Sequence, residues 1–254
     1  MIDILFGTIQ GITEFLPISS SGHLVVLSEL FKYKSFNTYE IAFLHLGTFF
    51  SILIYYFKDI FSILKNRNSL IQILKLIVIG VMPAAAFGLF FPISNLIDES
   101  SIILVLTAVA YIFIASVLYF ADKLEEGGKS ILDLSLKESL TIGFAQALAL
   151  FPGVSRSGIT LSTALYLKLK KTEAIFFSLL LGMPTIFGAW LLTFIQAQEP
   201  IDSSLWIPCI AAFLSGLVAI RVLINFTVSS KLNVFSIYCF LMGLVSLITY
   251  LINL

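Results

Sequence analysis

Long runs of apolar residues limit the folds that this chain can adopt more than any other feature. Six of these runs cover residues 39–57, 70–91, 102–120, 173–195, 205–226 and 234–252. A helix needs about 20 apolar residues to cross the hydrocarbon core of a bilayer. Only 12% of the residues are charged, whereas soluble domains carry roughly 25%. We therefore predict an all-α polytopic membrane protein, residues 1–254 forming a single membrane domain with six spans.

Two further apolar regions, 4–30 and 140–167, are interrupted by polar residues in the sequences LPISSSG and FPGVSRSG. Non-helical backbone inside a membrane survives only where protein or a water-filled cavity covers it. We expect each region to form two half-helices joined at a polar tip. Such a segment is a re-entrant hairpin, which enters and leaves on the same side of the membrane.

The two interrupted regions are similar to each other. Aligned without gaps, QGITEFLPISSSGH (10–23) and QALALFPGVSRSGI (146–159) share five identities, and the same offset of 136 residues aligns the spans that follow. We predict internal repeats at about 1–120 and 137–254, with a linker at about 121–136. Each half is then one hairpin plus three spans. Because three is an odd number, the second half is inverted in the membrane, as in other inverted-repeat membrane proteins.

Basic residues predict the orientation, because they concentrate on the cytoplasmic side. If the 58–69 loop is cytoplasmic, twelve of the 15 lysines and arginines lie at or near that side, and Lys32 and Lys34 lie outside. We therefore expect both termini to face outward. The first hairpin then enters from outside and the second from the cytoplasm, so that their tips meet head to head.

The two tips gather the polar chemistry of the chain. The first carries Gln10, Glu14, Ser19, Ser20, Ser21, Gly22 and His23, and the second carries Gly153, Ser155, Arg156, Ser157, Gly158 and Thr160. Each tip leads into a helix N-terminus, where free N–H groups and the helix dipole favour an anion. A guanidinium inside a bilayer needs a partner, and its planar fork fits phosphate oxygens. The tips therefore predict a phosphate pocket covered from lipid.

Simpler interpretations of single residues remain open. Glu14 and Arg156 could form a structural ion pair that joins the hairpins, and small residues in membrane helices often serve only close packing. His45 lies on an otherwise apolar span, and we interpret it as a packing residue or one that supports the site. Cys209 and Cys239 lie in apolar runs and are interpreted as buried thiols. The formal net charge is zero, which gives no indication of a nucleic-acid partner.

The two tip segments resemble the signature motifs of the bacterial undecaprenyl-diphosphate phosphatase family, the bacitracin-resistance membrane phosphatases. QGITEF fits that family's pattern of Glu or Gln, three residues and Glu, with Gln10 where other members have a second glutamate. FLPISSSGH fits its serine-rich segment, which ends in histidine. PGVSRSGIT fits Pro-Gly-x-Ser-Arg-Ser-x-x-Thr at every fixed position. The likeness covers essentially the whole chain.

The resemblance implies hydrolysis of undecaprenyl diphosphate to undecaprenyl phosphate and inorganic phosphate. This reaction recycles the lipid carrier of cell-wall synthesis and confers bacitracin resistance. The family resemblance also implies the bacterial inner (plasma) membrane, an active site open to the outer face, and a divalent cation, Mg²⁺ or Ca²⁺. Glu14 and Gln10 are the candidate ligands of that ion, because both ions prefer oxygen ligands.

Within this reaction we expect Ser20, His23, Arg156 and Glu14 to form the catalytic set. Arg156 would bind the terminal phosphate and stabilise the charge that develops on it. Two nucleophiles are open: Ser20 with His23 as its base, or a water that His23 activates while Ser20 binds phosphate. Glu14 would orient His23 or hold the metal. The remaining phosphate-binding or supporting residues are Ser19, Ser21, Gly22, Ser155, Ser157, Gly158 and Thr160.

The alternative function is an inverted-repeat transporter or lipid flippase without hydrolysis, because paired broken helices are also a transporter architecture. Transport alone has no need of serine, histidine and arginine together, which favours the phosphatase. The expected partners are a polyprenyl diphosphate lipid as substrate and the surrounding membrane lipids. A homodimer is left open.

Overall fold

The computed structural model describes residues 2–31, 38–90, 102–197 and 203–253, and within these ranges the chain is helical and forms no sheet. Eleven α-helices and two short 3₁₀ helices follow one another. They are α1 (Ile2–Phe15), α2 (Ser20–Phe31), α3 (Thr38–Tyr55), α4 (Phe57–Lys65), α5 (Arg67–Phe90), α7 (Ile103–Asp122), η1 (Ile131–Asp133), α8 (Leu136–Leu148), α9 (Arg156–Tyr166), α10 (Lys171–Ala197), η2 (Ser203–Leu205), α11 (Trp206–Val228) and α12 (Leu232–Ile252).

Five of these helices, α5, α7, α10, α11 and α12, are long and apolar enough to cross a membrane. Helices α3 and α4 make a sixth candidate if the two count as one span, although the chain bends by 66° between them. The prediction of an all-helical, multi-pass membrane protein is therefore confirmed, with five to six candidate spans in the described ranges.

Helix α4 corrects one expectation, because most of the 58–69 segment is helical rather than a loop. Phe57, Phe61 and Leu64 are exposed along it. The rings of Phe57 and Phe61 stack with centroids 6.0 Å apart, and the Lys65 ammonium lies 4.5 Å from the Phe61 ring. Apolar residues at a spacing of four and three are typical of an amphipathic helix. Of this segment we used only the basic residues, to orient the chain, and did not take this spacing into account.

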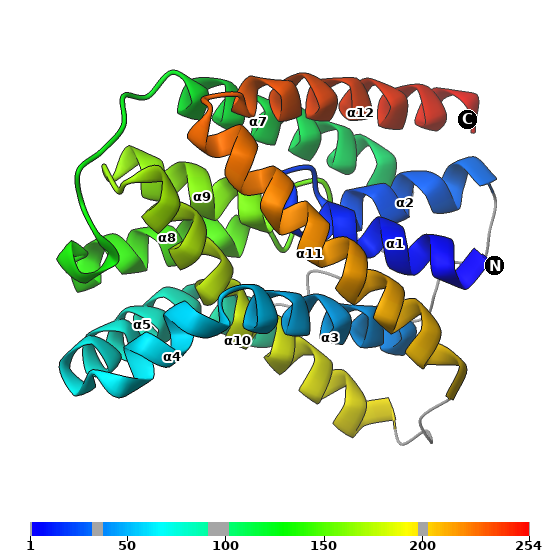
Figure 1. Cartoon of the computed structure of the whole chain (residues 1–254). Coiled ribbons are helices and arrows are strands. Elements are labelled where there is room, and N and C mark those ends of the chain that lie inside the picture. Colours follow the sequence, from blue (N-terminus) through cyan, green and yellow to red (C-terminus); the bar gives the residue numbers. More distant parts are fainter. Residues whose placement is uncertain (1, 32–37, 91–101, 198–202, 254) are drawn as a thin grey trace.

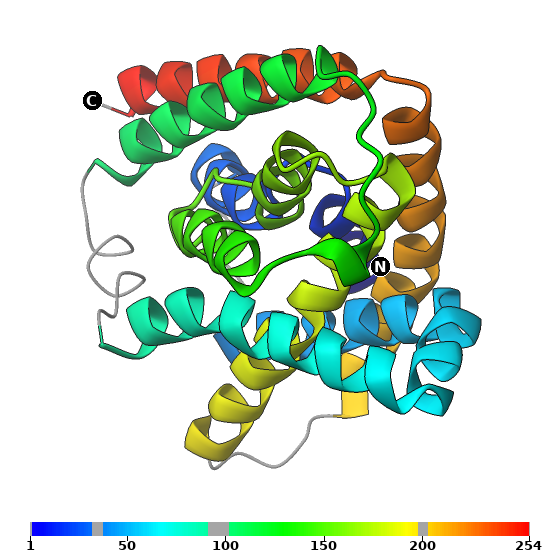
Figure 2. The same ribbon diagram turned by 90° about the vertical axis from the view of Figure 1, so that its left-hand side faces the viewer.

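The two interrupted regions each form a pair of helices separated by a short break. Helix α1 ends at Phe15 and α2 begins at Ser20, whereas α8 ends at Leu148 and α9 begins at Arg156. Figure 1 shows the two pairs approaching from opposite ends of the molecule, with their breaks near its middle. Figure 2 shows all four short helices surrounded by the longer ones. The first break is largely buried, whereas Phe151 in the second is exposed.

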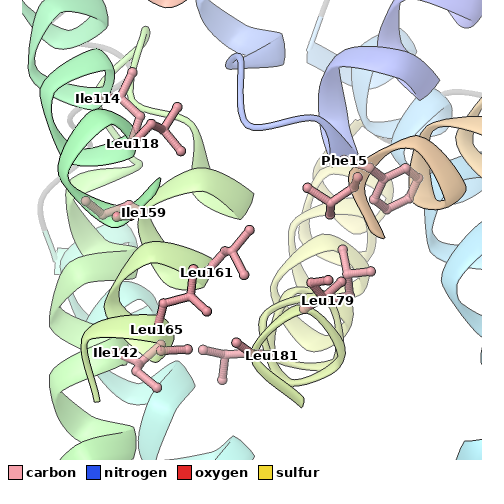
Figure 3. Close-up of a cluster of buried hydrophobic side chains, with 14 of the residues drawn as sticks. Phe15, Ile114, Leu118, Ile142, Ile159, Leu161, Leu165, Leu179 and Leu181 are labelled. Carbon is pink, nitrogen blue, oxygen red and sulfur yellow. The ribbon is translucent and has the colours of Figure 1, made fainter. Parts of the chain in front are cut away.

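Helix α9 lies inside the hydrophobic core and is buried on all sides over most of its length. Figure 3 shows Ile159, Leu161 and Leu165 of α9 among leucine and isoleucine side chains of α7, α8 and α10. Neighbouring α8 packs closely on α5, where a Cβ on Gly143 would collide with the carbonyl of Gly80. This packing holds the first residue of α9, Arg156, in a defined place.

Candidate active site

Both breaks end in a serine that caps the helix after it. The Ser19 Oγ accepts a hydrogen bond of 3.2 Å from the Gly22 N–H, and the Ser155 Oγ accepts one of 3.2 Å from the Gly158 N–H. A serine oxygen that satisfies a free N–H of the first turn is a preferred helix cap. Ser19 adopts a left-handed φ of 64°. Residues of both capped N-termini line the same cavity.

Arg156 is paired with Glu14. Its Nη2 donates to the Glu14 Oε1 across 142 residues of sequence, which joins the start of α9 to the last turn of α1. The two side chains are only 15% and 7% exposed. A buried charge left without its partner is costly, so this pair supplies the partner that a guanidinium at this depth requires.

The second oxygen of Glu14 is shared by three groups. The Ser20 hydroxyl donates to Oε2 over 2.9 Å, and the Gln10 amide donates to it over 3.1 Å. The Nδ1 of His45 lies 3.4 Å from the same oxygen. The Gln10 amide nitrogen is also 3.2 Å from that Nδ1. Glu14 is therefore the centre of a polar cluster drawn from α1, α2, α3 and α9.

His23 belongs to a different cluster. Its Nδ1 lies 2.7 Å from the Ser19 carbonyl oxygen and 3.0 Å from the Tyr111 hydroxyl. Its Nε2 lies 2.6 Å from the Tyr238 hydroxyl, and the His23 and Tyr238 rings are stacked. In the described part of the chain no hydrogen bond joins Ser20 to His23, so their pairing stays a prediction.

The second tip is tied to the first by its serines. Ser155 and Ser157 have hydroxyl oxygens 3.2 Å apart, and the Ser157 hydroxyl donates to the Leu16 carbonyl over 3.3 Å. Thr160 donates to the Arg156 carbonyl over 2.8 Å and lies 2.6 Å from the Ser178 hydroxyl. Thr160 therefore holds the first turn of α9 from inside the protein.

A cavity of about 190 Å³ lies between the tips. It is lined by Thr13, Glu14, Ser19, Ser20, Ser21, His45, Ala149, Val154, Ser155 and Arg156. Six of these were predicted as site residues. The other predicted residues, which surround the cavity without lining it, are Gln10, Gly22, His23, Ser157, Gly158 and Thr160.

Four lining residues were not predicted to face the pocket, and the two polar ones among them are Thr13 and His45. Thr13 lies inside QGITEF, but at one of the three positions that the family pattern leaves variable. We interpreted His45 as a packing or supporting residue; it lines the cavity, its side chain is 26% exposed, and its Nδ1 lies 3.4 Å from Glu14 Oε2. A histidine within an apolar span was the one indication available in the sequence.

Part of the guanidinium of Arg156 has no partner among the described residues. Its Nη1 is buried without a hydrogen bond and lies against Gly182 of α10, where a Cβ would collide with it. A buried donor without an acceptor is costly. The Arg156 side chain also lines the cavity, where the two capped helix N-termini favour negative charge.

The described side chains alone supply few oxygen ligands for a divalent ion. In the described ranges no group of three or more His, Cys, Asp or Glu side chains is placed to hold a metal. Among the cavity-lining residues Glu14 is the one carboxylate, and its two oxygens already bind Arg156, Ser20 and Gln10. Hard cations need several oxygen ligands, so no step of the reaction is assigned to a metal.

Comparison with known proteins gives consistent results. The family model described as "Bacitracin resistance protein BacA" matches residues 3–245. A protein of Thermosipho africanus named undecaprenyl-diphosphatase is 39% identical over 97% of this chain and 98% of its own length. Proteins of Methanococcus vannielii, named undecaprenyl-diphosphatase, and Bacillus cereus, named undecaprenyl-diphosphatase 3, are 37% and 35% identical over 96% of this chain and cover 98% and 94% of their own lengths.

Proposed function

The chain belongs to the bacitracin resistance protein BacA family, and from this membership we propose that it hydrolyses undecaprenyl diphosphate to undecaprenyl phosphate and inorganic phosphate. Relatives matched over nearly their whole length carry the name undecaprenyl-diphosphatase. The reaction would return the lipid carrier to cell-wall synthesis and so oppose bacitracin.

The observation that carries the proposal is the buried guanidinium at the wall of the hydroxyl-lined cavity. The Nη2 of Arg156 donates to Glu14, and the arginine side chain lines the cavity. Ser19, Ser20 and Ser155 add hydroxyls to the same cavity. Phosphoryl transfer depends mainly on positioning and on neutralising charge. A phosphate placed here meets both requirements, because an arginine fork fits its oxygens.

The chemistry can be written for either nucleophile. The oxygen of Ser20, or of a water molecule, forms a bond to the terminal phosphorus. The bond from that phosphorus to the bridging oxygen breaks, and the departing lipid monophosphate keeps the electron pair. If Ser20 attacks, water then hydrolyses the phosphoserine. In either case the attacking oxygen must lose a proton, and Glu14 Oε2 already accepts a hydrogen bond from Ser20 over 2.9 Å.

His23 remains a predicted catalytic residue. Its contacts to the Ser19 carbonyl and to two tyrosine hydroxyls suit it to holding the turn that presents Ser20. Mg²⁺ or Ca²⁺ likewise stays a prediction, to be tested by titration.

We also propose that the two halves are inverted repeats, each with one re-entrant hairpin, and that both termini and the cavity opening face the outer side of the bacterial plasma membrane. The packing of the helices supports the repeat. With the 136-residue offset, α1 corresponds to α8 and α5 to α11. Helix α1 packs against α11, and α8 packs against α5, so each half supplies the same pair of surfaces to the other.

The test is release of inorganic phosphate from undecaprenyl diphosphate by the purified protein in detergent, with Mg²⁺ and Ca²⁺ titrated. We expect turnover by the parent and a loss of about a hundredfold or more in Arg156→Ala, the scale of losing one charge-stabilising donor. Arg221→Ala, at an exposed arginine of α11, is the matched control. Transport cannot occur in detergent, so any phosphate released there must come from hydrolysis. No release by folded parent with either ion would contradict the proposal and favour a carrier.

A further inference from the structure

His45 is one of only two histidines in the chain, and it is the one that lines the cavity. The other, His23, has both ring nitrogens within hydrogen-bonding distance of Ser19, Tyr111 and Tyr238. The imidazole that faces the reacting centre is therefore on α3, a helix outside both motifs that carry the family resemblance.

The position of His45 is fixed by the packing of α3 on α11. Gly47 lies so close to α11 that a Cβ there would collide with the Cys209 carbonyl. One turn later, the Ser51 hydroxyl donates to the Phe213 carbonyl over 2.8 Å. These contacts place the His45 side chain beside Glu14, where it lines the cavity and is 26% exposed.

The contacts of His45 suit an imidazole that gains and loses a proton. When neutral, its Nδ1 can accept from the Gln10 amide, 3.2 Å away. When protonated, the same Nδ1 can donate to Glu14 Oε2, 3.4 Å away. Ser20 donates to that same oxygen. One carboxylate oxygen therefore lies between the hydroxyl that can attack and the imidazole.

Glu14 is a poor final position for the proton of the attacking oxygen. Its other oxygen is the buried partner of Arg156, and a neutral Glu14 would leave that guanidinium without its counter-charge. Removing one partner from a buried ion pair is strongly unfavourable. A second acceptor beside Oε2 would restore the carboxylate and would place the new positive charge next to the cavity.

We propose that His45 is this second acceptor, a positioning residue that acts through Glu14. The inference rests on the proposed phosphatase function. The O–H bond of the attacking oxygen breaks as its bond to phosphorus forms, and the proton passes to Glu14 Oε2 and then to His45 Nδ1. The product is an imidazolium beside a restored carboxylate. The lone pair of the broken phosphoanhydride bond leaves with the lipid monophosphate, so atoms and charges balance.

A purely structural role for His45 makes a different prediction. Glutamine can replace the hydrogen bonds of an imidazole and much of its shape, but it cannot take up a proton. Gln10 lies 3.2 Å from the His45 ring, so a carboxylate at position 10 would bring a proton acceptor back to the same place. Variants at positions 10 and 45 therefore distinguish a requirement for a proton acceptor from a requirement for a hydrogen bond.

The experiment compares the parent, His45→Gln and the double variant Gln10→Glu/His45→Gln, with Ser116→Ala on the exposed face of α7 as control. Phosphate release from undecaprenyl diphosphate in detergent gives kcat and KM, and thermal unfolding checks the fold. We expect His45→Gln to lower kcat about a hundredfold, the low end for acid–base catalysis, with KM within about threefold. The double variant should regain at least about tenfold of that loss.

A kcat of His45→Gln within about threefold of the parent would overturn the inference, as would a large loss that the double variant does not recover. If His45→Gln does not fold, His45→Ala assayed with added imidazole takes its place. Recovery of kcat with imidazole would support a proton acceptor, and the absence of recovery would refute it. Failure of the proposed function is distinguishable, because the parent itself would then release no phosphate.

Discussion

Replacing Arg156 with glutamine should destabilise the protein because it leaves Glu14 as a buried carboxylate without a full positive partner. The Glu14 side chain is 7% exposed, and its remaining neighbours are the amide of Gln10, the hydroxyl of Ser20 and His45. Breaking a buried pair from one side costs about 3–5 kcal/mol. Since Oε2 keeps its hydrogen bonds, we expect about 3 kcal/mol for Arg156→Gln.

The matched comparison is the double variant Glu14→Gln/Arg156→Gln. Two neutral amides can bond to each other, so the double variant should lie within about 1 kcal/mol of the parent, as neutral replacements of buried pairs often do. The measurement is the free energy of unfolding in mixed micelles for the parent, both single variants and the double variant. The coupling energy of this cycle should approach the sum of the single losses.

Two results would refute this reasoning. One is an Arg156→Gln variant that loses less than about 1 kcal/mol, below the range expected for a broken buried pair. The other is a double variant as unstable as the sum of the singles, which would mean that the pair contributes no coupling. Neither the single nor the double variant should release phosphate, so stability and activity separate in the double variant.

Three further outcomes are expected. Gly143→Ala should lower the free energy of unfolding by about 1–3 kcal/mol, as overpacking does, because a Cβ collides with the α5 backbone; an unchanged value in mixed micelles would contradict this. Tyr238→Phe should lower the free energy of unfolding by about 1 kcal/mol, because it removes the hydroxyl that lies 2.6 Å from His23 Nε2. Equal stability would mean that this contact contributes nothing. The backbone N–H and hydroxyl of Ser130 lower the pKa of the Asp133 carboxyl from its ordinary value of 3.8, so this stabilisation is present above that value and is lost as the pH falls below it. Thermal unfolding of Asp133→Asn should therefore differ from the parent at neutral pH and converge with it in acid, and a difference that widens in acid would contradict the assignment.

Much of the fold could be predicted because membrane helices are visible as continuous apolar runs. The two breaks could also be predicted, since glycine, proline and clustered serines interrupt those runs. The bend after Tyr55 could not, because the run of apolar residues continues through it into α4. Hydropathy indicates that a segment prefers lipid or a protein interior, but it does not indicate where the helix changes direction.

The site shows the same limit at the level of side chains. Residues within the tip motifs were predicted together, and Glu14, Ser20 and Arg156 do lie around one cavity. His45 was harder to assign because α3 is mostly apolar, and the small hydroxyl residues Thr48 and Ser51 give only a weak indication of the face that turns inward. Its packing on α1, α10 and α11 decides that face. Ser20 was predicted to pair with His23, three residues downstream, whereas its hydroxyl donates to Glu14, six residues upstream.

The bond between Arg156 and Glu14 also has an evolutionary consequence. The two codons are 142 positions apart, yet a change in either residue leaves the charge of the other one buried without a partner. A lineage that altered one residue would pass through a poorly folded ancestor before the second change could rescue it. Descendants should therefore keep both residues or exchange them as a pair, and a half of the gene that is duplicated or transferred alone would carry only one of them.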